Sequence, residues 1–215
     1  MAVTRGSRPL PNPPDPIPRF GDRRRMRIGL LGGSFNPAHH GHLHVAQVVR
    51  RSLRLDQVWL LVSPGNPLKP KAGMAPFAGR LASAARIADG RRILASGIEA
   101  ALNTRYTVDT IRILLQRFPN ARFVWIMGAD LLEQLPHWRR WTDIVRRMAF
   151  VVLPRPRYSN RALAGQAAHR LRAGRRPVRE APLLPGAPPA WVFLPARQTA
   201  VSATAIRQAA EGTVL

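Results

Sequence analysis

A chain of 215 residues with 46% hydrophobic residues is long enough to bury the core of one domain, and its composition excludes a disordered protein. It contains no cysteine, which excludes disulfides, thiolate metal sites and cysteine nucleophiles. The formal charge of +23 favours anionic substrates such as nucleotides. Because the arginines are scattered over the whole length, we expect no specific nucleic-acid binding.

The first 25 residues are rich in Pro and Arg and show no hydrophobic period. We therefore expect a flexible tail at 1–25 and a single domain at 26–215. The tail lacks the apolar stretch of a signal peptide, and no run in the sequence approaches the roughly 18 apolar residues of a membrane span. The sequence predicts a cytoplasmic protein with no membrane partner, and it leaves the oligomeric state open.

From Met26 onward, apolar runs typical of buried strands alternate with segments whose apolar residues have helical spacing. The predicted elements are, in chain order, a strand at 26–35, a helix at 40–53, a strand at 57–65, a helix at 76–89, a strand at 91–97, a helix at 106–118, a strand at 122–130, a strand at 148–156, a helix at 161–174, a strand at 190–196 and a helix at 202–212. This alternation predicts an α/β fold with an open, doubly wound parallel sheet. Such sheets bind ligands beyond the carboxyl ends of their strands.

The segment 32–43 links the first predicted strand to the first helix, where backbone N–H groups and the helix dipole favour a phosphate. It is neither a dinucleotide fingerprint nor a Walker loop, because the glycine spacing differs and no Gly-Lys-Ser/Thr follows. His39 and His42 flank Gly41, and both side chains can face one point if the helix begins near His40.

Paired imidazoles at this turn can bind a metal, act as acid and base, or donate hydrogen bonds to charge that develops on a phosphate. Zinc would need a third protein ligand, and the chain has no Cys, although Asp and Glu remain possible. The histidines can also be incidental polar residues on a helix. Phosphate recognition is the favoured interpretation.

The last predicted helix begins with hydroxyl residues, Ser202 and Thr204, and carries Arg207 one turn further on. Hydroxyls and unpaired N–H groups at a helix start, together with a forked guanidinium, suit a polyphosphate. The alternative is an ordinary capped surface helix.

Both end segments resemble motifs of one family. Residues 32–43, GGSFNPAHHGHL, resemble the signature of the nucleotidyltransferase superfamily whose H-x-G-H motif holds nucleotide phosphates, and 201–207 is similar to its second motif, which closes with Ile-Arg. Within this superfamily the middle segments 63–70, 106–110 and 127–138 are similar to nicotinate-mononucleotide adenylyltransferases. Two residues depart from the pattern: Ala203 replaces a hydroxyl residue, and Leu68 stands where a His is frequent.

The resemblance implies a Rossmann-like nucleotidyltransferase fold and transfer of the adenylyl group of ATP to nicotinate mononucleotide, with Mg²⁺ bridging the phosphates. A sister enzyme that uses nicotinamide mononucleotide, pantetheine phosphate or CTP would keep both end motifs, so these substrates remain alternatives. A basic nucleic-acid-binding module is the rival from a different class of protein.

The resemblance also implies roles for individual residues. It assigns catalysis to His39, His42 and Arg207. It assigns ATP binding to Gly32, Gly33, Ser34, Phe35, His39, His42, Gly128, Asp130, Ser202, Thr204, Ile206 and Arg207. It assigns binding of the acceptor nucleotide to Asn36, Lys69, Thr107 and Trp138. No residue is expected to be a dedicated metal ligand, because Mg²⁺ can be held mainly by substrate phosphates.

Overall fold

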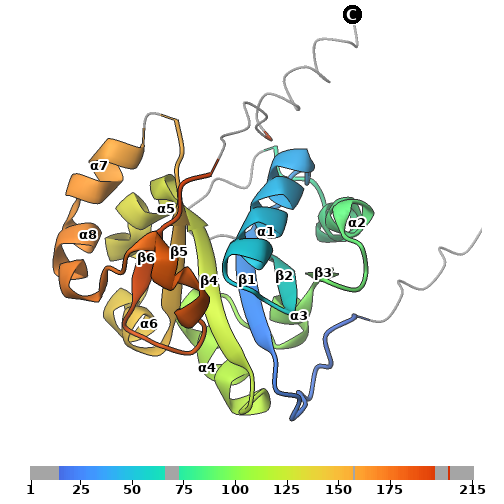
Figure 1. Ribbon diagram of the computed structural model, residues 1–215. Coiled ribbons are helices and arrows are strands. Elements are labelled where there is room, and N and C mark those ends of the chain that lie inside the picture. Colours follow the sequence, from blue (N-terminus) through green and yellow to red (C-terminus); the bar gives the residue numbers. More distant parts are fainter. Residues whose placement is uncertain (1–14, 66–72, 157, 197–202, 204–215) are drawn as a thin grey trace, which may run out of the picture.

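The computed structural model describes residues 15–65, 73–156, 158–196 and 203. In these residues six strands form one parallel sheet with the order β3-β2-β1-β4-β5-β6 (Figure 1). The strands are β1 (Arg27–Gly33), β2 (Gln57–Val62), β3 (Ile93–Ser96), β4 (Arg122–Gly128), β5 (Ala149–Leu153) and β6 (Trp191–Phe193). The predicted α/β class and the open parallel sheet are confirmed.

Helices connect the strands and cover both faces of the sheet. The α-helices are α1 (His40–Ser52), α2 (Phe77–Ile87), α3 (Ile98–Ala101), α4 (Thr107–Arg117), α5 (Ala129–Gln134), α6 (Trp141–Arg147), α7 (Ser159–Ala164) and α8 (Gln166–Arg170). The 3₁₀ segments are η1 (Leu135–His137), η2 (Arg172–Gly174) and η3 (Val178–Leu183). The predicted helix at 161–174 is instead α7, α8 and η2, with a break at Gly165, and the last predicted helix lies outside the described residues except for Ala203.

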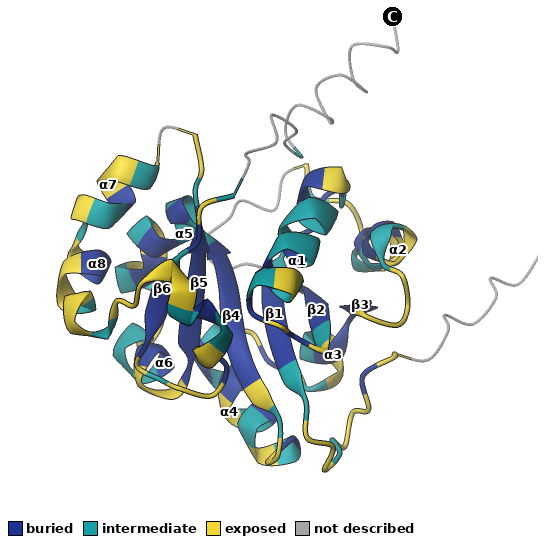
Figure 2. Cartoon of the chain, viewed as in Figure 1, coloured by how far each residue is buried: buried dark blue, intermediate teal, exposed yellow. Residues whose placement is uncertain are grey.

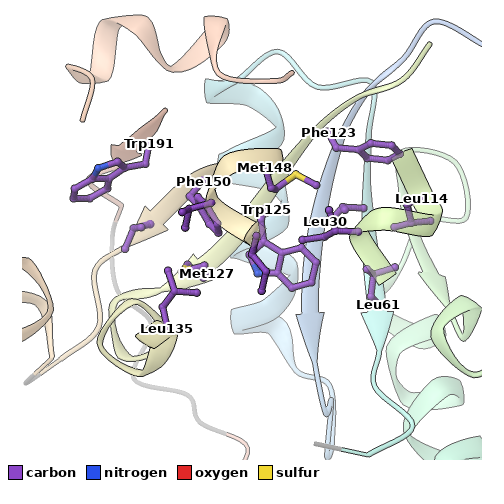
Figure 3. Packing of buried hydrophobic residues seen from close by; sticks show 14 of the residues in the cluster. Leu30, Leu61, Leu114, Phe123, Trp125, Met127, Leu135, Met148, Phe150 and Trp191 are labelled. Carbon is purple, nitrogen blue, oxygen red and sulfur yellow. The ribbon is translucent and has the colours of Figure 1, made fainter. Parts of the chain in front are cut away.

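Successive strand residues alternate between the two faces of the sheet, and each face has its own core. In β4, Phe123, Trp125 and Met127 pack with the helices α3 to α8, whereas Val124 and Ile126 pack with α1 and α2. Figure 2 shows the central strands as buried, and Figure 3 shows the first of these cores. Because both faces are covered, the strands read as continuous apolar runs in the sequence.

The segment before β1 is part of the domain from Asp15 onward. Ile17 is 1% exposed and belongs to the core that contains Trp125. The Asp15 carboxylate accepts hydrogen bonds from the Ser96 hydroxyl at 2.6 Å and from the Gly97 N–H at 2.7 Å. The predicted tail boundary at residue 25 is therefore wrong for residues 15–25, because a single buried apolar residue among prolines leaves no period to detect.

Between the neighbouring strands β1 and β4 the order in which the chain adds strands to the sheet reverses. From β1 the chain proceeds through α1 to β2 on one side, and it returns through α4 to β4 on the other side. The carboxyl ends of β1 and β4 therefore border the crevice in which open α/β sheets bind ligands. Among the described residues, no helix combines the length and the apolar character that a membrane crossing requires.

Candidate active site

The turn after β1 begins the candidate site. His39 is the N-cap of α1 with an extended backbone, and its Nδ1 accepts a hydrogen bond from the Gly41 N–H at 3.1 Å. In return, the Nδ1 of His42 accepts a hydrogen bond from the His39 N–H at 3.2 Å. This reciprocal pair is a capping box made of two histidines. It confirms the prediction that the helix begins near His40.

The two imidazoles lie against each other, with ring centroids 3.9 Å apart, and the ring of Phe35 lies 4.9 Å from that of His42. Because each Nδ1 accepts from a backbone N–H, the neutral form of each ring carries its proton on Nε2. Burial, and then the charges of Arg155 and His40, lower the pKa of His39 below its usual 6.5. Near neutral pH His39 is therefore an uncharged donor through Nε2.

These histidines line a pocket at the carboxyl ends of β1, β4 and β5, which we call the histidine pocket. Its lining residues are Leu31, His39, Gly41, His42, His44, Val45, Met127, Gly128, Leu153, Pro154, Arg155, Pro156 and Ala196. Arg155 was missed by sequence reasoning, although it lies near the end of the strand predicted at 148–156 and follows β5 at the edge where ligands bind. Imidazole donors and a guanidinium together suit a polyphosphate.

Asp130 lies beside the histidine pocket with one carboxylate oxygen unsatisfied. Its Oδ1 is buried and accepts no hydrogen bond from the described residues, and the Nε of Arg155 is 3.5 Å away. A Cβ at Gly128 would come within 2.3 Å of this oxygen, so glycine is what permits its position. A buried oxygen without a donor is costly, which makes Asp130 a candidate acceptor for a ligand hydroxyl.

A second pocket, which we call the tryptophan pocket, opens on the other side of the end of β1. It encloses about 880 Å³, its open mouth included. Its lining residues are Gly32, Gly33, Ser34, Ser63, Gly65, Glu99, Arg105, Tyr106, Thr107, Trp125, Leu131, Trp138 and Arg139. Leu31 lines the histidine pocket and Gly32 the tryptophan pocket, so the end of β1 lies between the two.

Trp138 and Thr107, both predicted to bind the acceptor, come together in the tryptophan pocket. Trp138 follows η1 and is half-buried, with its ring against that of Trp125 at a centroid distance of 6.4 Å and an interplanar angle of 82°. Thr107 is the first residue of α4, so the positive end of this helix faces the pocket. An aromatic ring beside a helix start can hold a flat ring that carries an anionic group.

Three further residues of the tryptophan pocket carry charge and were missed by sequence reasoning. Glu99 accepts a hydrogen bond from the Thr110 hydroxyl at 3.0 Å, and burial raises its pKa to about 7. Arg105 is exposed and lies two residues before α4, and the guanidinium of Arg139 lies 4.7 Å from the centroid of the Tyr106 ring. Only Arg139 had a signal in the sequence, because it adjoins Trp138.

Several residues predicted to bind ATP or the acceptor do not line the pocket to which that substrate is assigned. Gly32, Gly33 and Ser34, predicted to bind ATP, line the tryptophan pocket and not the histidine pocket. Phe35 is 2% exposed. The Asn36 amide donates to the Gly73 carbonyl at 2.8 Å and accepts from the Ala75 N–H at 3.1 Å, outside both pockets. The structure thus does not bring Asn36 together with Thr107 and Trp138.

Five predicted site residues lie outside the described residues. They are Lys69, Ser202, Thr204, Ile206 and Arg207. Their assignments to ATP, to the acceptor and to catalysis stay predictions.

Comparison with known proteins agrees with the fold. The model of the cytidylyltransferase-like family matches residues 30–209. The chain therefore belongs to the cytidylyltransferase-like family and is a nucleotidyltransferase.

Similar proteins narrow the class further. The chain is 58% identical to a probable nicotinate-nucleotide adenylyltransferase of Gluconacetobacter diazotrophicus over 195 residues, which is 90% of this chain and 91% of that protein. It is 60% identical to one of Gluconobacter oxydans over 187 residues, 86% of this chain and 96% of that protein. Within the family, the chain thus belongs with the nicotinate-nucleotide adenylyltransferases.

A solved structure supports the fold. The chain resembles the Plasmodium falciparum nicotinic acid mononucleotide adenylyltransferase complexed with NaAD, with a TM-score of 0.64 and 16% identity, over 85% of this chain and 83% of that one. At this identity the likeness confirms the Rossmann-like nucleotidyltransferase fold alone.

Proposed function

We propose that the protein transfers the adenylyl group of ATP to nicotinate mononucleotide, giving nicotinate adenine dinucleotide and pyrophosphate in NAD biosynthesis. The observation that supports this most strongly is the pair of histidine rings after β1, whose centroids lie 3.9 Å apart, with one pocket on each side of that strand end. Relatives at 58% and 60% identity named for this reaction support the choice of acceptor.

We assign the histidine pocket to the ATP phosphates and the tryptophan pocket to the acceptor. The first offers imidazole donors and Arg155. The Oδ1 of Asp130 beside it accepts no hydrogen bond from the described residues and can accept one from a ribose hydroxyl. The second offers Trp138 for the pyridine ring and the start of α4 for its carboxylate. Because the pockets meet at the end of β1, the two substrates would react across the turn that carries His39 and His42.

The reaction needs no protein nucleophile. A phosphate oxygen of the acceptor, already an anion near neutral pH, forms a bond to the α-phosphorus of ATP. The bond from that phosphorus to the oxygen bridging to the β-phosphate breaks, and pyrophosphate leaves with the electron pair. The protein contributes alignment of the two phosphates and hydrogen bonds to the negative charge that develops. An uncharged Nε2–H donor such as that of His39 does this without exchanging a proton.

Mg²⁺ belongs to this proposal as an ion carried by ATP. No cluster of three or more His, Asp or Glu side chains that could hold a metal ion exists in the described part of the chain. Mg²⁺ can keep several waters and would be held mainly by substrate phosphates, so the proposal requires no dedicated protein ligand. When bound, Mg²⁺ neutralises charge on the phosphates. A cytoplasmic location and the lack of specific nucleic-acid binding stay predictions.

Pyrophosphate release in the presence of ATP and Mg²⁺ tests the proposal. Nicotinate mononucleotide, nicotinamide mononucleotide and pantetheine phosphate are compared side by side as acceptors. We expect kcat/KM to be highest with nicotinate mononucleotide. A preference for another acceptor would keep the adenylyl transfer and reject the proposed substrate, and no release with any acceptor would reject adenylyl transfer itself.

A further inference from the structure

A single buried guanidinium joins the two loops that form one wall of the tryptophan pocket. Arg80, in α2, is 3% exposed, and no carboxylate of the described residues pairs with it. It donates instead to backbone carbonyls: Nη1 to Ser34 at 2.8 Å and to Ser63 at 2.7 Å, Nη2 to Pro64 at 3.3 Å, and Nε to Ala75 at 3.0 Å. A buried cation is tolerated only when it is extensively hydrogen-bonded, and these four bonds use four of the five N–H groups of the guanidinium.

Two of the four bonded carbonyls belong to residues that line the pocket. Ser34 and Ser63 line the tryptophan pocket, and so does Gly65, which follows Pro64. Neither Ser34 nor Ser63 lines the histidine pocket. Arg80 therefore acts on the proposed acceptor side of the site, through the turn after β1 and the loop after β2.

Because peptide groups are planar, the hydrogen bonds from Arg80 to these carbonyls also set the direction of the N–H groups that follow them. In a trans peptide the C=O and the following N–H point in opposite directions. With the Ser34 and Pro64 carbonyls turned toward Arg80, the N–H groups of Phe35 and Gly65 are turned away from it. Arg80 thus fixes the direction of two backbone donors on residues at or beside the pocket wall.

The same turn contains a conformation that needs support. Phe35 has a φ of 48°, a left-handed value that is unfavourable for a large aromatic residue. Such a conformation persists only where the surroundings hold it. Besides the bond from Arg80 to Ser34, the Ser83 hydroxyl, one turn further along α2, accepts from the Ala38 N–H at 2.9 Å. The turn is therefore fixed from α2 on both sides of Phe35.

We propose that Arg80 is a positioning residue for the acceptor, which orients the backbone of 34–35 and 63–65 and thereby shapes the wall of the tryptophan pocket. The inference rests on the proposed function, because it assigns that pocket to the acceptor. It predicts that loss of Arg80 weakens the use of the acceptor more than the use of ATP.

Steady-state kinetics of Arg80→Lys and Arg80→Met test the inference. Lysine keeps the charge but lacks the planar fork that reaches several carbonyls, and methionine removes both. Arg86→Met is the matched control, because Arg86 lies on the same helix and is exposed. Turnover is expressed per folded molecule, with melting temperatures measured for every variant.

For both Arg80 variants we expect the acceptor KM to rise on the order of 10-fold or more, because displaced backbone in a site is costly. The KM for ATP should change less than about 3-fold, and Arg86→Met should match the wild type, since an unchanged interaction leaves KM unchanged. Arg80→Lys keeps the test valid if the Met variant does not fold. Lower melting temperatures with both KM values unchanged, or an equal rise in both KM values, would overturn the inference.

A parallel measurement separates this inference from the proposed function. Trp138→Leu changes the tryptophan pocket without touching Arg80. If Trp138→Leu raises the acceptor KM and the Arg80 variants do not, only the role of Arg80 is rejected. If neither Trp138→Leu nor the Arg80 variants change the acceptor KM, the tryptophan pocket is not the acceptor site. The inference about Arg80 then fails together with that assignment.

Discussion

Replacing His39 by two different residues separates its structural role from its proposed chemical role. The side chain has two functions that different atoms perform: Nδ1 caps α1 by accepting from the Gly41 N–H at 3.1 Å, and Nε2 carries the proton proposed to face ATP. Asparagine is among the best N-cap residues and can keep the capping bond, whereas alanine cannot. Neither supplies a donor at the position of Nε2.

The magnitudes follow from these two functions. His39→Ala should lower the free energy of unfolding by about 1 kcal/mol, the usual effect of losing an N-cap, and His39→Asn by less than about half of that. The bond from the His39 N–H to His42 remains in both variants, because it uses the backbone. Both variants should lose kcat by a factor on the order of 10² to 10³, the typical effect of removing one donor to developing charge.

Urea unfolding and pyrophosphate release, measured on the same preparations, give the two readouts. The expected result is that His39→Asn unfolds at nearly the wild-type urea concentration and has a lowered kcat for pyrophosphate release. The reasoning is refuted if His39→Asn turns over at the wild-type rate, because then the Nε2 donor contributes nothing and His39 only caps the helix. Equal losses of stability in both variants would instead contradict the capping role.

Three further predictions concern the two pockets. Trp138→Leu should raise the acceptor KM roughly 3- to 10-fold, the usual worth of a ring contact, while Trp141→Leu, which lies outside both pockets, should leave it unchanged in the same assay. Burial raises the pKa of Glu99 from 4.5 to about 7, so the folded state holds this proton more tightly than the unfolded state, and the free energy of unfolding should fall as pH rises through that range. Urea titrations at pH 5 and pH 8 should show a smaller fall in the free energy of unfolding for Glu99→Gln than for the wild type. Equal falls in the two proteins would contradict the burial argument. Burial and then the charge of Arg155 lower the pKa of His39, so kcat/KM should decline only at pH values below 6.5. Arg155→Met should move this decline to higher pH. An unchanged pH profile in this variant would show that Arg155 does not act on His39.

The fold could be predicted from the sequence because its signals are long and local. Each of the six strands is an apolar run with a turn after it, and α1, α2 and α4 span 11 to 13 residues, long enough to show the helical period. The helices α3, α5 and α6 have 4 to 7 residues and were not predicted. Short helices of this kind depend on tertiary packing, which no local pattern reports.

The site was predictable where one segment contains all its parts. The capping box of His39 and His42 lies within four consecutive residues, and Trp138 and Thr107 each lie in a segment similar to the family. Glu99 and Arg80 had no such signal, because their partners lie in other elements; Glu99 in α3, for example, accepts from Thr110 in α4. Arg80 reaches carbonyls up to 46 residues away, and a sequence shows only an arginine on an ordinary helix. Nothing in the sequence indicates that the amide of Asn36 bonds to Gly73 and Ala75, and its assignment to the acceptor stays a prediction.

The close approach of β1 to β4 gives a last prediction about the tryptophan pocket. A Cβ at Gly32 would lie 2.9 Å from Cζ2 of Trp125, whose ring is 3% exposed and meets the ring of Trp138. Since the Trp125 ring is buried, it cannot move away freely, and Gly32→Ala should cost about 1–3 kcal/mol of stability through overpacking. The displaced ring should also shift Trp138 and raise the acceptor KM.

The matched control is Gly79→Ala. A Cβ at Gly79 meets nothing within 4 Å, and the residue lies within α2, so alanine there should stabilise the protein by about 0.5–1 kcal/mol. The prediction is met if the melting temperature falls for Gly32→Ala and rises for Gly79→Ala, and if the acceptor KM rises only for Gly32→Ala. This result would show that Trp125 holds the ring of Trp138 in place. A Gly32→Ala protein that is as stable as the wild type and binds the acceptor normally would show that the two rings do not move together, and the acceptor would then depend on Trp138 alone.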